Sequence, residues 1–277
     1  MIILKAFKDL TLMKDILHRE LPQSVNVLGG LHHMLQNNVF QLKMCVDSWP
    51  TFSTAICFRQ NQIGNDFKEI NEKYSIFSKN QNSLRRLLTD DKLIQWRDGL
   101  EFEVANHHSQ IVREIASLRG VHVAEDGGYH SYINYSPEKL IMSEKTSTLA
   151  TSTLNESHVE LVVQHLPSRG WKENSNLIEA YIKHLPNRCV VDEKGHPVSW
   201  VLTDEFNELT FTYSHPNYRR KGHISHLLFT LIQQKISEGS PVFCQIHKDN
   251  AASIIVMSKS GFIRGVETTY LMVKAEG

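Results

Sequence analysis

The order of secondary-structure signals in the second half of the chain constrains its fold most strongly. Periodicity and turn residues there predict the order helix, helix, strand, strand, strand, helix, strand, helix, strand. A predicted strand at 208–214 leads into a basic segment that contains Gly222, and a helix with an apolar stripe from Ile224 to Leu231 follows. Strands and helices that alternate in this way favour a mixed sheet covered by helices. We therefore expect an α/β fold.

The first half of the chain is expected to be α/β or α+β. Asn37 and Asn38 are predicted to form a tight turn between its first two strands. A Ser/Thr-rich stretch at 136–154 begins a new pattern, so we predict domains at 1–136 and 137–277. The predicted helices of the first half are 5–20, 84–96 and 109–118, and its strand-like runs are 25–30, 39–46, 52–59 and 74–78.

The composition excludes several classes of protein. The chain has 277 residues, 41% of them apolar, which is enough for a core. Lys and Arg number 30 against 30 Asp and Glu, so an electrostatic nucleic-acid binder is not expected. No run approaches the roughly 18–20 apolar residues of a membrane span. We also expect no secretory signal, because the first residues lack a basic segment followed by a long apolar one.

Neither cysteine nor histidine suggests a metal site. The four cysteines form no CxxC pair, so we expect buried free thiols in a reducing compartment. The chain has 15 histidines, and the doublets at 32–33 and 107–108 are the most noticeable of them. Neighbouring side chains point away from each other on a strand or a helix, so neither doublet is a chelating pair. We predict no bound metal.

The sharpest local feature is the segment from Arg219 to Ile224, between a predicted strand and a predicted helix. The N–H groups at such a helix start point outward, and the helix dipole favours an anion there. Gly222 removes the Cβ that would block a close approach, and the three preceding cations add positive charge. A pyrophosphate fits this chemistry, although a solvated basic turn remains the alternative.

Two motifs at matching separation resemble the GCN5-related N-acetyltransferase superfamily. Arg219–Ile224 resembles its pyrophosphate loop Q/R-x-x-G-x-G/A, and the stretch from Asn250 to Phe262 resembles N-x-x-A-x-x-x-Y-x-K-x-G-F. The segments VDSWPTF, YSIFSKN, LIQW, DEKGHPVSW and HPNYRRKG resemble the glycine N-acyltransferase family over essentially the whole chain. The resemblance implies tandem acetyltransferase-like domains, of which only the second binds acyl-CoA. It implies transfer of an acyl group to the amine of glycine or another small amino acid.

The resemblance also implies roles for individual residues. Glu208 matches the position of the general base, which removes a proton from the acceptor amine. His215 is the competing base, and Arg188 and Arg169 are candidates for binding the acceptor carboxylate. A backbone N–H in 212–214 is expected to polarise the acyl carbonyl. The residues expected to bind the co-substrate are Thr212, Tyr213, Ser214, Arg219, Arg220, Lys221, Gly222, His223, Ile224 and Asn250.

Two departures from the superfamily pattern keep alternatives open. Ile224 stands where the loop usually ends in Gly or Ala, and Met257 stands where many acetyltransferases place a tyrosine as acid. The leaving thiolate would then be protonated by Ser258 or by water, or it would leave without an acid. We favour water. The alternatives are an acetyl-CoA-dependent acetyltransferase of proteins or polyamines, and an acyl-CoA-binding paralogue without turnover.

The remaining expectations follow from the same resemblance. We expect acyl-CoA as a co-substrate and no prosthetic group. The first half has no comparable glycine loop, so it is not expected to bind a second CoA. We predict a monomer in the mitochondrial matrix, with the cytoplasm and the endoplasmic reticulum left open.

Overall fold

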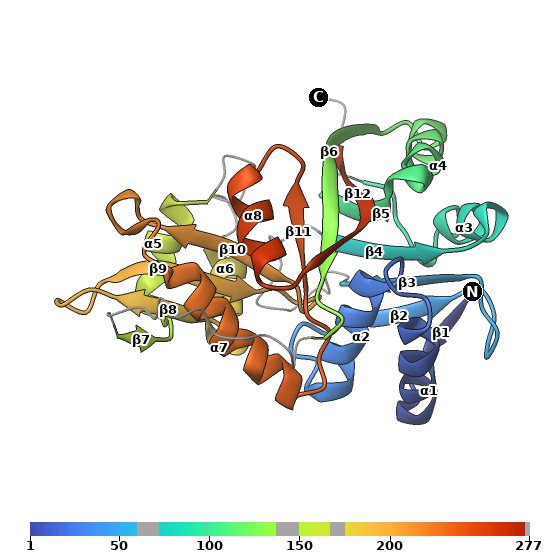
Figure 1. Cartoon of the computed structure of the whole chain (residues 1–277). Helices are drawn as coiled ribbons and strands as arrows, with labels where there is room; N and C mark the ends of the chain where they lie inside the picture. Colours follow the sequence, from blue (N-terminus) through green and yellow to red (C-terminus); the bar gives the residue numbers. More distant parts are fainter. Residues whose placement is uncertain (60–71, 98, 137–149, 167–174, 275–277) are drawn as a thin grey trace. The chain divides into compact units, whose positions relative to one another are not determined.

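The computed structural model describes residues 1–59, 72–97, 99–136, 150–166 and 175–274 (Figure 1). The chain forms two compact units, which are Met1–Ser131 with Gly265–Gly277 (the first unit) and Tyr132–Arg264 (the second unit). Both combine strands with covering helices, which confirms the predicted α/β class. The predicted domain boundary at 136/137 lies at the edge of the undescribed 137–149 and stays a prediction.

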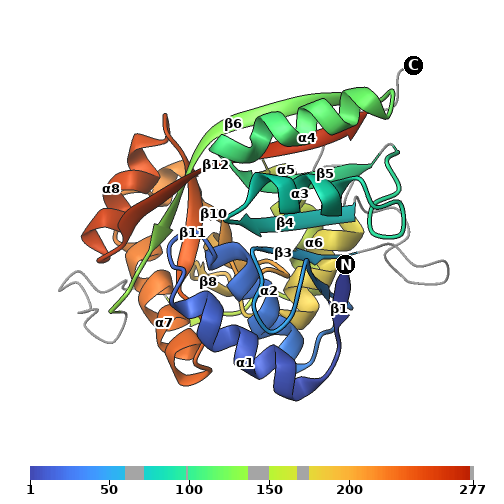
Figure 2. The same cartoon turned by 90° about the vertical axis from the view of Figure 1, so that its right-hand side faces the viewer.

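The first unit is built on a mixed sheet. The strands of this eight-stranded sheet lie in the order β1-β2-β3-β4-β5-β12-β6-β11, of which β11 (Phe243–His247) is a strand of the second unit. The neighbours from β1 to β4 are antiparallel, β4 and β5 are parallel, and β5 and β12 are antiparallel. Helices α1 and α2 cover one face of this sheet, and α3 and α4 cover the other (Figure 2). The elements are β1 (Ile2–Leu4), α1 (Phe7–His18), α2 (Val25–Gln36), β2 (Lys43–Val46), β3 (Thr54–Phe58), β4 (Glu72–Ser78), α3 (Gln81–Leu88), β5 (Leu100–Ala105), α4 (Asn106–Leu118) and β6 (His122–Ile133).

The second unit contains an antiparallel sheet in the order β10-β9-β8-β7. Helix α7 packs on β8, β9 and β10, and α6 packs on β9. The predicted order is confirmed from the first helix to the last strand, whereas the short strand β7 before that helix was not predicted. The elements are β7 (Thr151–Ser152), α5 (Val159–Gln164), α6 (Ser175–His184), β8 (Arg188–Val191), β9 (Pro197–Thr203), β10 (Leu209–Ser214), α7 (His223–Ser237), β11 (Phe243–His247), α8 (Ala251–Lys259) and β12 (Ile263–Lys274), with short 3-10 helices at Glu156–His158 and Pro216–Tyr218.

The two halves of the chain repeat one order of elements. From β1 to β6 the chain forms a strand, two helices, three strands, a helix, a strand, a helix and a strand. From β7 to β12 the same order recurs, if the short 3-10 helices are set aside. The tandem organisation expected from the resemblance is therefore visible in the topology, although the two halves share no obvious sequence repeat.

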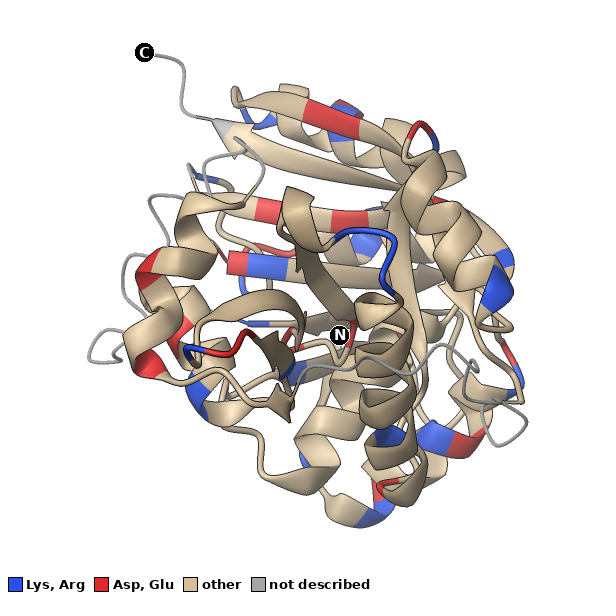
Figure 3. Cartoon of the chain, turned by 60° about the vertical axis from the view of Figure 1, so that its left-hand side comes forward, with Lys and Arg blue, Asp and Glu red and all other residues tan. Residues whose placement is uncertain are grey.

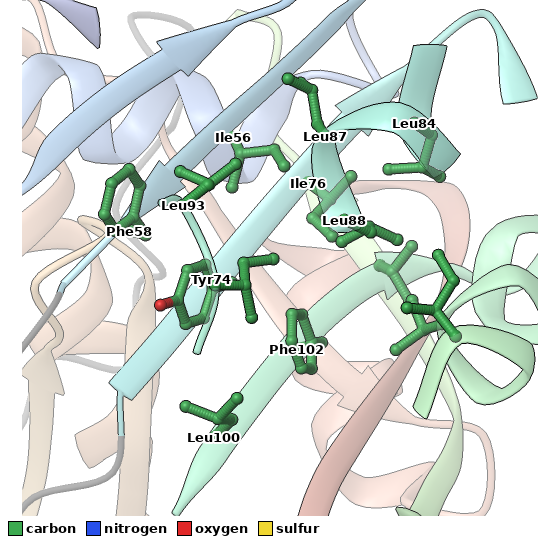
Figure 4. Packing of buried hydrophobic residues seen from close by; sticks show 14 of the residues in the cluster. Ile56, Phe58, Tyr74, Ile76, Leu84, Leu87, Leu88, Leu93, Leu100 and Phe102 are labelled. Atoms are coloured by element: carbon green, nitrogen blue, oxygen red, sulfur yellow. The ribbon is translucent and has the colours of Figure 1, made fainter. Parts of the chain in front are cut away.

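Aromatic stacking organises the core of the first unit (Figure 4). The rings come from Phe58 of β3, Tyr74 of β4 and Phe102 of β5. The ring centroid of Tyr74 lies 5.3 Å from that of Phe58 and 5.2 Å from that of Phe102. Leu84, Leu87 and Leu88 of α3 belong to the same cluster. Full burial of each such side chain contributes about 1.5–3 kcal/mol.

The core of the second unit lies between α7 and its sheet. The stripe predicted from Ile224 to Leu231 is confirmed, because Leu227, Leu228 and Leu231 are fully buried. They pack with Val201 of β9 and with residues of β11. The four cysteines of the chain are buried and free, as predicted: Cys45, Cys57, Cys189 and Cys244.

Three predictions for the first half were wrong. The run 25–30 begins the helix α2 and is not a strand. Because almost all of Val25–His33 is buried, its apolar residues form no one-sided stripe that would identify a helix. Asn38, at φ 43°, lies in the connection from α2 to β2, so its turn does not join two strands. The helix expected to reach residue 96 ends at Leu88.

No helix in the described part of the chain is long and apolar enough to cross a membrane. The same residues contain no group of three or more His, Cys, Asp or Glu side chains that could hold a metal ion.

Candidate active site

The segment that precedes α7 forms an open helix N-terminus. Gly222 is the N-cap residue, at φ 80° and ψ 2°, and no side chain caps the helix. Glycine adopts this left-handed conformation without the strain that a Cβ would add. The first-turn N–H groups, those of His223, Ile224 and Ser225, have no acceptor within the helix. This geometry suits an anion.

Three basic side chains surround this helix start. Arg219, Arg220 and Lys221 are exposed, and no carboxylate in the described part of the chain pairs with them (blue in Figure 3). The Nε of Arg219 donates to the Ser214 carbonyl at 3.1 Å, which ties the segment to the end of β10. The Nζ of Lys221 lies 4.9 Å from the ring centroid of Tyr218. The positive charge is therefore available to a ligand.

His223 links the loop to the sheet. Its side chain is buried, and its Nδ1 lies 3.4 Å from the Ser199 Oγ of β9. Ser199 in turn contacts the Ser214 hydroxyl at 2.7 Å. Burial, followed by the charge of Lys221, lowers the pKa of His223, so the neutral imidazole is favoured. The imidazole thus anchors the helix start, which leaves the backbone N–H for a ligand.

Strand β10 contains a β-bulge that the sequence pattern did not predict. Thr210 pairs with Leu202 and Tyr213 with Trp200, so two residues, Phe211 and Thr212, oppose one residue of β9. Phe211 adopts φ 47°, which is rare for a bulky residue. A bulge of this kind bends its strand.

The bulge reverses the expected alternation of faces. Leu209 packs in the core under α7. Tyr213 instead stacks on Trp200, with 4.6 Å between the ring centroids, and contacts the tilted ring of His165 at 4.4 Å. The prediction that Leu209, Phe211 and Tyr213 share one face was therefore wrong. The sequence ELTFTYS alternates regularly, and only the backbone of Phe211 breaks the pattern.

Strands β10 and β11 are not joined by a ladder. β10 is the edge strand of the four-stranded sheet, and β11 belongs to another sheet, although the two strands are neighbours. Thr212 is exposed on this edge. The backbone of β10 therefore offers hydrogen-bonding groups to an extended ligand, as sheet edges do.

Glu208 lies at the start of this edge and bridges toward β11. Its side chain is only 6% exposed. The Oε1 atom accepts a hydrogen bond from the Gln245 N–H of β11 at 2.8 Å, and the backbone N–H of Glu208 donates to Asp204 Oδ1 at 2.9 Å. In a continuous ladder the Gln245 N–H would donate to a backbone carbonyl of the neighbouring strand. Here it donates to the Glu208 carboxylate, because β10 and β11 are not paired. Glu208 is therefore not a surface carboxylate.

Lys235 is a charged residue of this region that sequence analysis missed. It is fully buried on α7, and its Nζ donates to the Asn207 carbonyl at 2.8 Å and to the Asn207 side chain. Burial lowers its pKa to about 7, against the opposite influence of the Asp204, Glu238 and Glu208 carboxylates. A sequence signal existed, because Lys235 lies four residues after Leu231 on the apolar stripe.

The other candidates lie in less suitable surroundings. His215 is exposed, and its Nδ1 accepts from the Asn217 N–H at 3.4 Å. Asn250, which was expected to bind the co-substrate, caps α8, since its Oδ1 accepts from the Ser253 N–H at 3.1 Å. The guanidinium of Arg188 donates to Asn187 and Gln234, which does not support a role in binding the acceptor carboxylate. Arg169 lies outside the described residues.

The position of the usual tyrosine acid is part of the core. Met257 is buried in the cluster beneath α7, and it has no proton to donate. The neighbouring Ser258 is exposed. The expectation that water serves the leaving group stays a prediction.

Known proteins resemble the chain over most of its length. Mouse glycine N-acyltransferase is 27% identical over 90% of both chains, and bovine glycine N-phenylacetyltransferase is 28% identical over 89% of both. A crystal structure of a Drosophila protein covers 98% of this chain and 97% of its own, with a TM-score of 0.78 at 15% identity. This likeness shows that the fold of the whole chain recurs.

The family models decide the reaction class. The model described as aralkyl acyl-CoA:amino acid N-acyltransferase matches residues 1–186, and its C-terminal region matches residues 188–268. The family's reaction transfers an acyl group from acyl-CoA, its co-substrate, to an amino acid. The chain belongs to the aralkyl acyl-CoA:amino acid N-acyltransferase family.

Proposed function

We propose that the protein transfers the acyl group of acyl-CoA to the amine of glycine or another small amino acid, with Glu208 as general base. The open junction of β10 and β11, which lies between the buried Glu208 carboxylate and the uncapped N-terminus of α7, carries this proposal. The names of the mouse and bovine relatives support glycine as the acceptor.

Acyl-CoA would bind along the edge of β10. The pyrophosphate would accept hydrogen bonds from the first-turn N–H groups of α7, with Arg219, Arg220 and Lys221 around it. The pantetheine arm would run between β10 and β11. A backbone N–H in 212–214 would then donate to the thioester oxygen and stabilise the oxyanion that forms on attack.

The Glu208 carboxylate would remove one proton from the acceptor ammonium, directly or through one water. The amine nitrogen then bonds to the thioester carbon, and the C–S bond breaks as the tetrahedral intermediate collapses. The electron pair of that bond leaves with CoA thiolate. The nitrogen, which carries one proton more than an amide, gives that proton to water, and water gives a proton to the thiolate. The proton that Glu208 took is released to solvent. The products are the N-acyl amino acid and free CoA thiol.

Calorimetric titration with acyl-CoA, followed by a free-thiol release assay, tests this proposal. We expect binding, and thiol release from benzoyl-CoA or medium-chain acyl-CoA when glycine or glutamine is present. Release only from acetyl-CoA with a polyamine or protein amine would show the acetyltransferase alternative instead. Binding without release would show a non-catalytic paralogue. This alternative is considered because Ile224 and Met257 differ from the residues of the superfamily motifs.

We also propose a monomer in the mitochondrial matrix, which follows from the family resemblance. Sedimentation of the purified chain tests the first statement, and fractionation of cells that express it tests the second. A cytoplasmic or endoplasmic-reticulum fraction would overturn the assignment to mitochondria.

A further inference from the structure

The proposed reaction leaves a buried lysine near Glu208 unused. Lys235 is fully buried on the face of α7 that packs against β8, β9 and β10. Its helix neighbours Leu228, Leu231 and Ile232 are core residues. Lysine is almost never fully buried unless it is paired, so this position needs an explanation.

Lys235 holds the residues that lead into β10. Its Nζ donates to the backbone carbonyl of Asn207, at 2.8 Å, and to the Asn207 side chain. Asn207 adopts φ 67° and also donates to Ser240 Oγ. The Asp204 carboxylate stabilises the turn at 204–208, because its Oδ1 accepts hydrogen bonds from the N–H groups of Phe206 and Glu208. The next side chain after Asn207 is that of Glu208.

The charged groups that act on Lys235 come from two parts of the second unit. Asp204 and Glu208 lie in the connection from β9 to β10, and Glu238 follows α7, and all three act electrostatically on Lys235. On β11, burial raises the pKa of Cys244, and the charge of Glu208 raises it further, so this thiol stays neutral. On β8, the guanidinium of Arg188 is directed to Gln234 and Asn187 instead.

We propose that Lys235 is a positioning residue for the acyl transfer, which fixes the turn Asp204–Glu208 and presents a positive charge to the Glu208 carboxylate. This inference rests on the proposed role of Glu208 as the base. A cation near the carboxylate favours its ionised form, which is the form that accepts a proton. The charge of Glu208 acts on Lys235, and the charge of Lys235 acts on Glu208 in return.

Three substitutions separate the charge from the hydrogen bond. Lys235→Met removes both, Lys235→Gln keeps a donor for the Asn207 carbonyl without charge, and Lys235→Arg keeps both. We expect the acidic limb of the kcat/KM profile for the amino acid to move up by about one pH unit in the Met and Gln variants. The KM for acyl-CoA should stay unchanged. Lys235→Arg should retain the limb of the unsubstituted protein.

Lys194→Met is the matched control, because Lys194 is exposed in the turn between β8 and β9. It should leave the profile unchanged. If the Met and Gln variants lower the melting temperature but keep the acidic limb in place, Lys235 is a structural residue only, and the proposal is overturned.

A second measurement does not depend on turnover. The infrared difference spectrum between the full chain and its Glu208→Gln variant reports the protonation of this one carboxyl as pH is varied. We expect its midpoint to rise in the Lys235→Met background. An unchanged midpoint overturns the inference, even where the assay detects no acyl transfer and the proposed function fails by itself.

Discussion

The two halves of the chain have the same order of elements but opposite chemistry at corresponding places. In the first unit β4 leads into α3, where the Asn80 side chain caps the helix by accepting from the Ser83 N–H. In the second unit β10 leads into α7, where Gly222 has no side chain to offer. One helix start is closed by the chain itself, and the other is open to a ligand.

The sheets differ at the corresponding junction. β4 and β5 form a parallel ladder from Glu72–Leu100 to Ile76–Val104, whereas β10 and β11 lie in separate sheets. A continuous ladder leaves no room for a ligand between the strands, since neighbouring strands lie about 4.8 Å apart. The shared fold alone therefore does not create an open junction, and the acyl-CoA site that we propose depends on the separated strands and the uncapped helix of the second unit.

A carboxylate lies at the start of the fourth strand in each half. Glu72 begins β4, and it forms an ion pair with Arg97 and accepts from the Tyr74 hydroxyl. Glu208 directly precedes β10 and accepts from a backbone N–H of β11. Because Glu72 is paired with an arginine, we interpret it as a structural residue. Glu208 remains a candidate proton acceptor.

Replacement of these two carboxylates should have the largest effect. Glu208→Gln should lower kcat about 10²–10⁴-fold below pH 8, because the amide cannot take the amine proton, with partial recovery at higher pH. Glu72→Gln should lower the melting temperature and leave kcat unchanged. Thiol release measured across pH checks both. A profile that Glu208→Gln does not alter would eliminate Glu208 as the base.

The buried Lys235 of α7 should make the stability of the second unit depend on pH. The corresponding helix of the first unit, α3, contains no lysine. Lys235 has a pKa of about 7 in the fold against 10.5 as the ordinary value. Between these values the unfolded chain binds more protons, so the free energy of unfolding rises with pH, by about 1 kcal/mol per unit. Below pH 7 this contribution is absent.

Urea unfolding at pH 7 and pH 9 measures this contribution. Lys235→Met should remove the rise, whereas Leu88→Met on the buried face of α3 should retain it. An equal rise in the unsubstituted chain and the Lys235→Met variant would show that Lys235 is not the group responsible.

The open helix start should depend on its glycine. Gly222→Val places a β-branched residue at φ 80°, which costs about 1–2 kcal/mol, and it should weaken acyl-CoA binding roughly tenfold. Gly195→Val is the control. Gly195 lies in the turn between β8 and β9 at φ +84°, and no other residue would lie within 4 Å of a Cβ added there. It should lower stability similarly without weakening acyl-CoA binding in calorimetry.

The smallest effect should follow from opening the capped helix. Asn80→Ala should lower the free energy of unfolding by about 1 kcal/mol, since the Ser83 N–H loses its acceptor. We expect no second acyl-CoA site, because β4 and β5 remain paired. A titration stoichiometry of two would contradict the role that the comparison assigns to the ladder.

Local signals predicted much of the second unit from the sequence. Asn250 as a cap, Gly261 at φ 76° after α8, and the stripe of α7 are short-range features with a direct physical cause. The bulge at Phe211 has no such signal, since neither glycine nor asparagine marks its positive φ. Sequence analysis identified Glu208 through the resemblance alone. Its burial and its bond to Gln245 depend on where β11 lies, and no local pattern encodes that.

The pairing of β12 with β5 has a consequence for the order in which the first unit folds. Thr268 lies opposite Ala105, and the Thr269 hydroxyl donates to the Asn106 side chain, which is 163 positions earlier in the chain. During synthesis on the ribosome, β5 therefore emerges long before the strand that completes its edge. Until then β5 offers an unsatisfied edge to other chains, which makes the nascent first half a natural client for chaperones.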